Sequence, residues 1–139
     1  METEKKVVYT AKVHTTGGRT SGHARSNDGR LDVRLSTPGT QGLGTNPEQL
    51  FAAAWSACFE ESIQIVARMM NVHLPEDIAV DPEIDLCSIG QSYFIQARLN
   101  VSLPGVDRET AQKLVDLGHQ NCVYSKAIRG NVDVVINLI

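Results

Sequence analysis

Two features that often reveal a protein's class are missing from this sequence of 139 residues, namely a long apolar run and a cluster of basic residues. No apolar run approaches the ~18 residues of a membrane-spanning helix, and the initial METEKK is not followed by the apolar stretch of a signal peptide. Lys and Arg are scattered and the net charge is −3, which argues against a nucleic-acid partner. We therefore expect a cytoplasmic protein with neither a nucleic-acid nor a membrane partner.

Cysteine is also scarce. The three cysteines, Cys58, Cys87 and Cys122, are an odd number at wide spacings, which suits reduced thiols better than a disulfide framework. The sequence has no C-x-x-C or H-x-x-x-H pair, so a zinc site of His119 with two cysteines has little support. We expect no metal and no bound cofactor.

The chain has the length of one domain, and residues 1–139 are expected to form a single domain. Alternating apolar and polar residues predict strands, and helical signals predict two main helices. The order of three strands, a helix, two strands, a helix and a strand indicates an α+β fold, with helices packed on one face of a largely antiparallel sheet. The expected strands are residues 7–13, 22–26, 31–35, 84–87, 93–103 and 132–138.

Capping signals mark the starts of both helices. Asn46 can cap the first, with Pro47 at its first position and the Glu48 carboxylate in its first turn, where the helix dipole favours negative charge. This helix is expected to reach about residue 70, either unbroken or with one break. Asp107 is expected to cap the second helix. Its inner face is expected to be Ala111, Leu114, Val115 and Gly118.

Cys58 lies in the most apolar part of the first helix. At ~100° per residue it falls in line with Ser62, Ile65 and Met69, and well away from Glu60 and Glu61. It is therefore expected to face the interior or an interface. Packing alone is the simpler explanation, since free cysteine is among the most buried residue types, and the same holds for Cys122. Cys87 is expected to do nothing chemical.

Three motifs carry a resemblance to a known family. They are TGGR at residues 16–19, TNPEQLFAAAWSACF at 45–59 and CVYSKAIRGN at 122–131. On these motifs, and along nearly the whole chain, the sequence resembles the organic hydroperoxide resistance proteins of the wider Ohr/OsmC family. The resemblance implies a thiol peroxidase that reduces organic hydroperoxides, built as an intertwined homodimer with active sites at the interface.

The resemblance also implies residue roles. Cys58 falls on the family's peroxidatic cysteine and Cys122 on its resolving cysteine, which together form a disulfide during turnover. Arg19 falls on the catalytic arginine, and Glu48 on the carboxylate that orients it. The implied reductant is an external dithiol, the dihydrolipoyl groups of lipoylated proteins. Val123 departs from the family, which commonly has proline at this position.

The chemistry explains these residue types. A buried cysteine stays protonated, and a guanidinium is a permanent counter-ion that favours its thiolate. On one straight helix Glu48 and Cys58 are about 15 Å apart. Either the helix breaks, or Glu48 serves the other subunit, or Arg19 spans the gap. The apolar residues of the helix are expected to form a pocket for a lipid-like peroxide. The candidates are Leu50, Phe51, Trp55, Phe59 and Met69, of which the pocket is expected to use some.

Two other functions fit the same residues. One is an OsmC-type peroxidase with a different substrate preference. The other is a redox-sensing or ligand-binding protein that uses a reversible Cys58–Cys122 disulfide without turnover.

Overall fold

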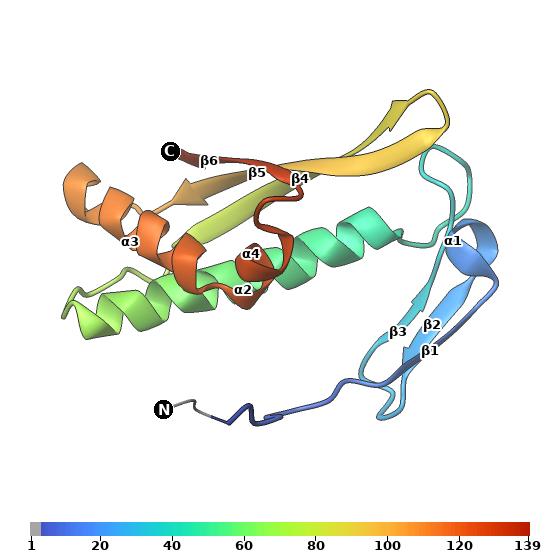
Figure 1. Cartoon of the computed structure of the whole chain (residues 1–139), viewed down its shortest axis with the longest axis horizontal. Helices are drawn as coiled ribbons and strands as arrows, with labels where there is room; N and C mark the ends of the chain where they lie inside the picture. Colours follow the sequence, from blue (N-terminus) through green and yellow to red (C-terminus); the bar gives the residue numbers. More distant parts are fainter. Residues whose placement is uncertain (1–3) are drawn as a thin grey trace. The chain divides into compact units, whose positions relative to one another are not determined.

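The computed structural model describes residues 4–139 (Figure 1). The chain forms two compact units, the first ending at Pro47 and the second spanning Glu48–Ile139. The expectation of a single domain stays a prediction, and the two units are described separately.

The first unit contains a three-stranded sheet in the order β1-β2-β3. Its strands are β1 (Val13–Thr16), β2 (His23–Ser26) and β3 (Asp32–Arg34), and both neighbouring pairs are antiparallel. Strands β2 and β3 form a hairpin, and Gly29 takes the positive φ of 75° that its turn requires. A short helix that the sequence did not predict, α1 (Gly18–Ser21), connects β1 to β2.

The strand predicted for residues 7–13 is wrong. The first strand begins at Val13, opposite Ser26, because β2 ends there in the hairpin turn. The preceding residues extend past the end of β2, and residues 4–12 form no strand in the described chain. Val8 is 89% exposed, so the alternation of these residues does not mark a buried face.

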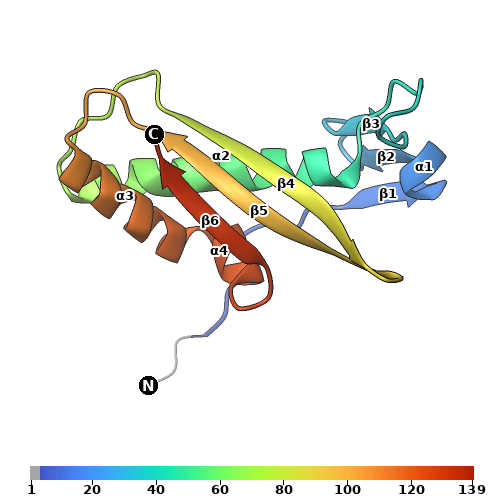
Figure 2. The same cartoon turned by 90° about the horizontal axis from the view of Figure 1, so that it is seen from above.

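The second unit packs helices on one face of a sheet, as the sequence predicted. Its sheet has the order β4-β5-β6, with β4 and β5 antiparallel and β5 and β6 parallel. Figures 1 and 2 show α2 and α3 on the same side of this sheet. The elements are α2 (Pro47–Met69), β4 (Ala79–Ile89), β5 (Ser92–Ser102), α3 (Arg108–Asn121), α4 (Val123–Ile128) and β6 (Asp133–Leu138).

Most boundaries in this unit match the predictions. Helix α2 begins at Pro47 and is unbroken to Met69, and the Asp107 carboxylate caps α3 by accepting a hydrogen bond from the Thr110 N–H at 3.0 Å. Strand β4 is longer than the predicted residues 84–87. The prediction began after Pro82, whereas the strand includes this residue. A proline is tolerated there because β4 is an edge strand and has a neighbour on one side only.

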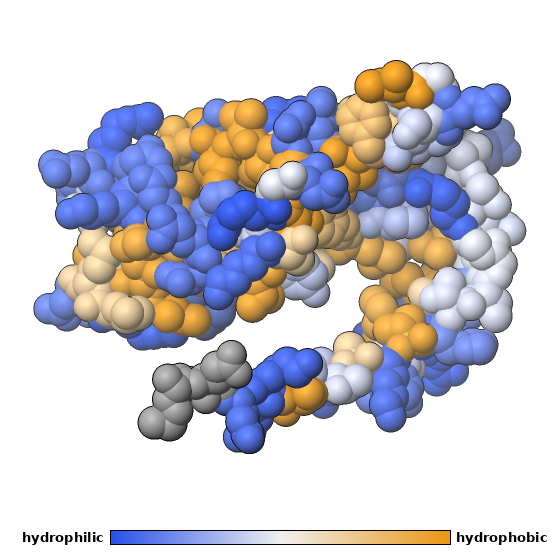
Figure 3. Space-filling view, in the orientation of Figure 1, coloured by the Kyte–Doolittle hydropathy of each residue, from blue (hydrophilic) through white to orange (hydrophobic). Residues whose placement is uncertain are grey.

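The core of the second unit lies between α2, α3 and the sheet. Trp55 and Phe59 of α2 and Leu99 of β5 are fully buried, and so is Cys122. The tip of the β4–β5 hairpin is different, since Ile89 and other apolar residues there lie on the surface (Figure 3). Within residues 4–139, no helix combines the length and apolar character needed to cross a bilayer.

Candidate active site

Two thiols from distant parts of the sequence meet in the second unit. Cys58 comes from the middle of α2 and Cys122 from the junction of α3 and α4. Their sulfurs lie 3.4 Å apart, with the Cys122 thiol donating toward Cys58, and both thiols are reduced. Cys58 is half-buried, whereas Cys122 has no exposed surface. A molecule from solution therefore reaches the Cys58 sulfur first.

The backbone at Cys122 explains how its side chain is held. Its N–H donates to the Gly118 carbonyl at 2.9 Å, and its own carbonyl accepts from the Lys126 N–H at 3.0 Å. Cys122 therefore ends α3 and begins α4, and it is extended, with φ −62° and ψ 127°. This single extended residue breaks what would otherwise be one helix and directs the thiol toward α2.

Opposing effects act on the Cys58 thiol. Burial raises its pKa most, and the hydrogen bond from Cys122 raises it further, while the backbone N–H groups of Tyr124 and Val123 lower it. The net direction is upward from the ordinary value. The second unit on its own thus favours the protonated thiol over the thiolate.

Cys58 is half-buried and packs against the core. In the line of residues through it, Ser62 is buried, whereas Ile65 is 44% exposed and Met69 80% exposed, so this line runs along the border of the buried face. That face is centred on Phe59 and Val66, which lie roughly 90° around the helix from Cys58. Cys58 is at the edge of the buried face, which gives it both partial burial and access.

The candidates for the apolar pocket differ in exposure. Trp55 and Phe59 are completely buried, so they belong to the core and cannot contact a substrate, and Met69 is mostly exposed. Phe51 is half-buried and stacks on Trp55 with ring centroids 5.4 Å apart. Beside the thiols the exposed side chains are Val123, at 62%, and Tyr124, at 40%. Both residues adjoin Cys58 through their backbone N–H groups, so their side chains offer apolar surface close to the thiol.

The buried hydroxyl of Ser125 lies close to Cys122 in the chain and was not identified from the sequence. The Trp55 indole N–H donates to the Ser125 hydroxyl at 3.1 Å, and the same hydroxyl lies 2.9 Å from Nδ1 of His119. The Arg129 guanidinium donates to the His119 backbone carbonyl at 2.7 Å. The spacing H-x-x-C-x-x-S around Cys122 was the available signal.

Comparison with known proteins places the chain in a family. Residues 38–137 match the family model described as OsmC-like protein. The chain belongs to the OsmC-like family.

Several relatives of this OsmC-like chain have names that describe a function. The organic hydroperoxide resistance protein of Xanthomonas axonopodis pv. citri is 44% identical over 142 residues, which cover 99% of each chain. The crystal structure of the organic hydroperoxide resistance protein OhrB of Bacillus subtilis matches with a TM-score of 0.89 and 40% identity, covering 96% of this chain and 100% of the other. An organic hydroperoxide resistance protein from Elizabethkingia anophelis matches with a TM-score of 0.88 and 33% identity, at 96% and 98% coverage. The predicted resemblance is thereby confirmed.

The other two predicted site residues of the OsmC-like chain lie at element starts. Arg19 is in α1 of the first unit and follows Gly17 and Gly18, whose φ values of 77° and 67° are positive. Glu48 lies in the first turn of α2. Because α2 is unbroken, a break in the helix no longer explains how Glu48 could serve Cys58. The other two explanations, a second subunit or a bridging Arg19, stay predictions.

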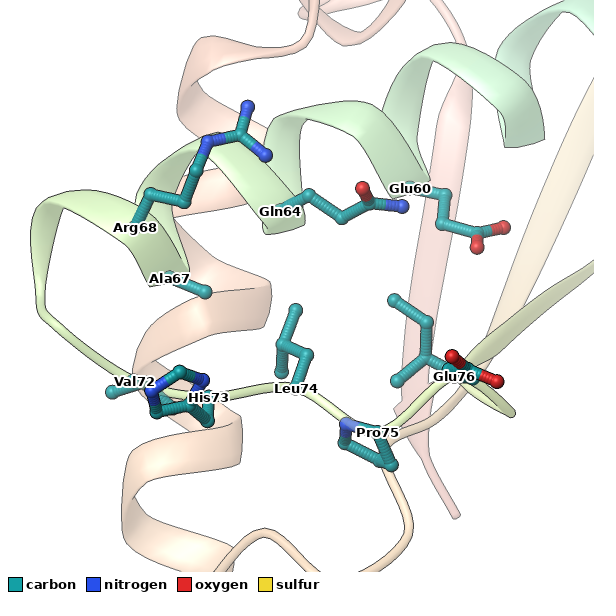
Figure 4. A pocket seen from close by; sticks show the side chains of 10 residues that line it. Glu60, Gln64, Ala67, Arg68, Val72, His73, Leu74, Pro75 and Glu76 are labelled. Atoms are coloured by element: carbon teal, nitrogen blue, oxygen red, sulfur yellow. The ribbon is translucent and has the colours of Figure 1, made fainter.

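The carboxylates that follow Phe59 point away from the thiols. Glu61 is 3.5 Å from the Arg68 guanidinium, and Glu60 lines a separate pocket of about 330 Å³ at the C-terminal half of α2 (Figure 4). Neither carboxylate is among the causes of the Cys58 pKa shift. Within residues 4–139, no group of three or more His, Cys, Asp or Glu side chains could hold a metal ion.

Proposed function

We propose that this chain is a cysteine-based peroxidase that reduces organic hydroperoxides to alcohols in defence against oxidative stress. The observation that carries the proposal is the 3.4 Å contact between a half-buried Cys58 and a fully buried Cys122. This asymmetry suits a nucleophile that meets the peroxide and a second thiol that acts afterwards. The names of the relatives, organic hydroperoxide resistance protein, support the substrate class.

The first chemical step takes place at Cys58. Its thiolate attacks the terminal oxygen of ROOH, so that an S–O bond forms while the O–O bond breaks. The alkoxide leaves and is protonated to ROH, and Cys58 is left as a sulfenic acid. Arg19 is proposed as the counter-ion that stabilises the thiolate, and Glu48 as the carboxylate that orients the guanidinium.

The second step joins the two thiols. The Cys122 sulfur attacks the Cys58 sulfenic sulfur, an S–S bond forms, and the hydroxyl leaves as water with the Cys122 proton. An external dithiol then reduces the disulfide by exchange. We propose dihydrolipoyl groups of lipoylated proteins as that dithiol, with no bound cofactor. We also propose that the working form is an intertwined homodimer, in the cytoplasm.

Peroxide consumption by the purified chain tests the proposal. With cumene hydroperoxide and dihydrolipoamide, the wild type should turn over, and Cys58→Ser should not. Cys122→Ser, given one equivalent of hydroperoxide without reductant, should consume it and remain as the sulfenic acid on Cys58, detectable by mass spectrometry after trapping. Normal turnover by Cys58→Ser would show that the nucleophile is misassigned. Thioredoxin in place of dihydrolipoamide tests the choice of reductant.

The same assay separates the alternatives. A redox sensor would form the Cys58–Cys122 disulfide once and would not be regenerated at a rate that supports turnover. An OsmC-type enzyme would turn over but with another order of preference among peroxides.

A further inference from the structure

The residues around the two thiols form a hydrogen-bonded chain that the peroxidase steps above do not use. Trp55 lies three residues before Cys58 on α2, and His119 and Ser125 lie three residues on either side of Cys122. One turn of helix thus separates each thiol from a member of this chain. Trp55 and Ser125 have no exposed surface at all.

The hydroxyl of Ser125 is the centre of the chain. It accepts from the Trp55 N–H at 3.1 Å and contacts His119 Nδ1 at 2.9 Å. Burial lowers the pKa of His119, and the positive charge of Arg129 adds to the effect, so the imidazole is neutral near pH 7. A neutral imidazole whose Nδ1 is unprotonated accepts the Ser125 O–H, and the hydroxyl then both accepts and donates.

This chain connects three helices at the place where Cys122 needs support. Ser125 is on α4, His119 on α3 and Trp55 on α2, the helix that also carries Cys58. The break at Cys122 leaves α3 and α4 joined by one extended residue. The His119–Ser125 contact spans that break, and the Trp55 bond ties both helices to α2.

The distance between the thiols shows why such support matters. The sulfurs are 3.4 Å apart and a disulfide is about 2.05 Å long, so they must approach by roughly 1.4 Å. The Cys58 sulfenic acid is meanwhile open to a second hydroperoxide, which would oxidise it to a sulfinic acid and release another ROH. Whether a disulfide or a sulfinic acid forms depends on whether the Cys122 sulfur is already in position to attack the Cys58 sulfur.

We propose that the Trp55–Ser125–His119 chain positions Cys122 for attack on the Cys58 sulfenic acid, and so directs the enzyme to the disulfide and away from the sulfinic acid. These are positioning residues, since they act through Cys122. The inference rests on the proposed peroxidase function for its consequence, but the positioning itself can be measured without a peroxide.

The first experiment measures how the sulfenic acid is partitioned. Reduced full-length chain is mixed with increasing cumene hydroperoxide without reductant, quenched, and analysed by mass spectrometry for disulfide and sulfinic acid. In Ser125→Ala the ratio of disulfide to sulfinic acid at a given peroxide concentration should fall by about ten- to a hundredfold, as expected for a misplaced reacting group. His119→Leu should act in the same direction, and His119→Asn, which keeps an acceptor near the Nδ1 position, should restore much of the ratio.

Two control variants separate positioning from loss of stability. Val101→Ala truncates a fully buried β5 residue and lowers stability without touching the hydrogen-bonded chain. Ser56→Ala removes a hydroxyl on α2 that bonds to its own helix, at the Ala52 carbonyl, at 2.8 Å. Neither should change the ratio by more than about twofold. An equal loss in Val101→Ala, or an unchanged ratio in both Ser125→Ala and His119→Leu, would overturn the inference.

The second experiment needs no hydroperoxide. Equilibration in glutathione buffers gives the effective concentration of the Cys58 and Cys122 thiols toward each other. Ser125→Ala should lower it by about tenfold or more, and an unchanged value overturns the positioning role. If wild type forms the disulfide here but does not consume peroxide, the proposed function is wrong while the positioning role stands.

Discussion

Replacing Gly118 by alanine should destabilise this protein, although the same change inside a helix ordinarily stabilises. Gly118 lies in α3 where that helix packs against α2, and a Cβ there would lie 2.9 Å from Cγ1 of Ile63, a fully buried residue. The gain in helix propensity is about 1 kcal/mol. Overpacking of a close-packed core costs about 1–3 kcal/mol. The expected net effect is a loss of roughly 0–2 kcal/mol, with about 1 kcal/mol as the central value.

Urea unfolding of the reduced protein, with and without an Ile63→Ala substitution, tests this prediction. Ile63→Ala removes the atom that the new methyl group would meet, at its own cost of about 2–5 kcal/mol. In that background Gly118→Ala should recover its helix benefit and become neutral or stabilising. The double-mutant cycle should therefore give a coupling of about 1–2 kcal/mol between the two positions.

The prediction has a consequence at the thiols, because the Gly118 carbonyl accepts the Cys122 N–H. A shift of α3 away from α2 carries Cys122 with it, and disulfide formation in Gly118→Ala should be slower than in wild type. A variant that is more stable than wild type by about 1 kcal/mol, with no coupling to Ile63, would refute the argument. It would mean that α3 can move without cost where Gly118 faces Ile63 of α2.

Four further outcomes are expected. Arg19→Ala should raise the Cys58 pKa further above the ordinary thiol value, so that less thiolate is present at pH 7. The pH–rate profile for peroxide attack should then move to higher pH. Rates of Cys58 alkylation measured against pH test this, and an unshifted Cys58 titration would exclude the counter-ion role of Arg19. Cumene hydroperoxide should react faster than hydrogen peroxide by about a hundredfold or more, because each buried methylene contributes about 0.8 kcal/mol. Val123→Ser should reduce this ratio of rate constants. Equal stopped-flow rate constants for the two peroxides would show that no apolar surface adjoins the thiol. Cys87→Ser should keep turnover within about threefold of wild type, since substitutions away from the thiol pair and the core usually have small effects. A hundredfold loss of turnover would contradict the assignment of Cys87 as a bystander. Asp107→Ala should lower the melting temperature. Asp107→Asn should lower it less, because Asn as well as Asp can cap α3. Equal melting temperatures for the alanine variant and wild type would rule out a stabilising cap.

Local signals predicted those elements whose stability is local. The Asn46-Pro47-Glu48 start of α2 was found because a helix N-terminus needs particular residue types at fixed positions. The alternation along β5 was found because one face of that strand packs against the helices. By contrast, residues 7–12 alternate equally well but have no partner strand in the described chain, and alternation does not reveal whether a partner exists.

The geometry of the thiol pair could not be obtained in the same way. The contact between Cys58 and Cys122 joins residues 64 positions apart, and only the resemblance to a family suggested it. The break at Cys122 carries no glycine or proline signal, and α4 is only six residues long. The members of the expected pocket could not be chosen for a related reason. Periodicity identifies an apolar face, but it does not show which of its members, such as Trp55, are sealed in the core.

Burial of the thiol pair has two opposite effects on the proposed chemistry. It raises the pKa of Cys58, which slows attack because the thiolate is the nucleophile. It also keeps Cys122 away from solvent, so that this thiol meets the sulfenic acid of its neighbour and not a hydroperoxide. Removing the burial would speed the first step but expose the second thiol. A counter-ion that favours the thiolate resolves the conflict without changing the packing. The proposed roles of Arg19 and of the Trp55–Ser125–His119 chain are therefore complementary. Arg19 promotes formation of the sulfenic acid, and the hydrogen-bonded chain determines whether that acid becomes a disulfide.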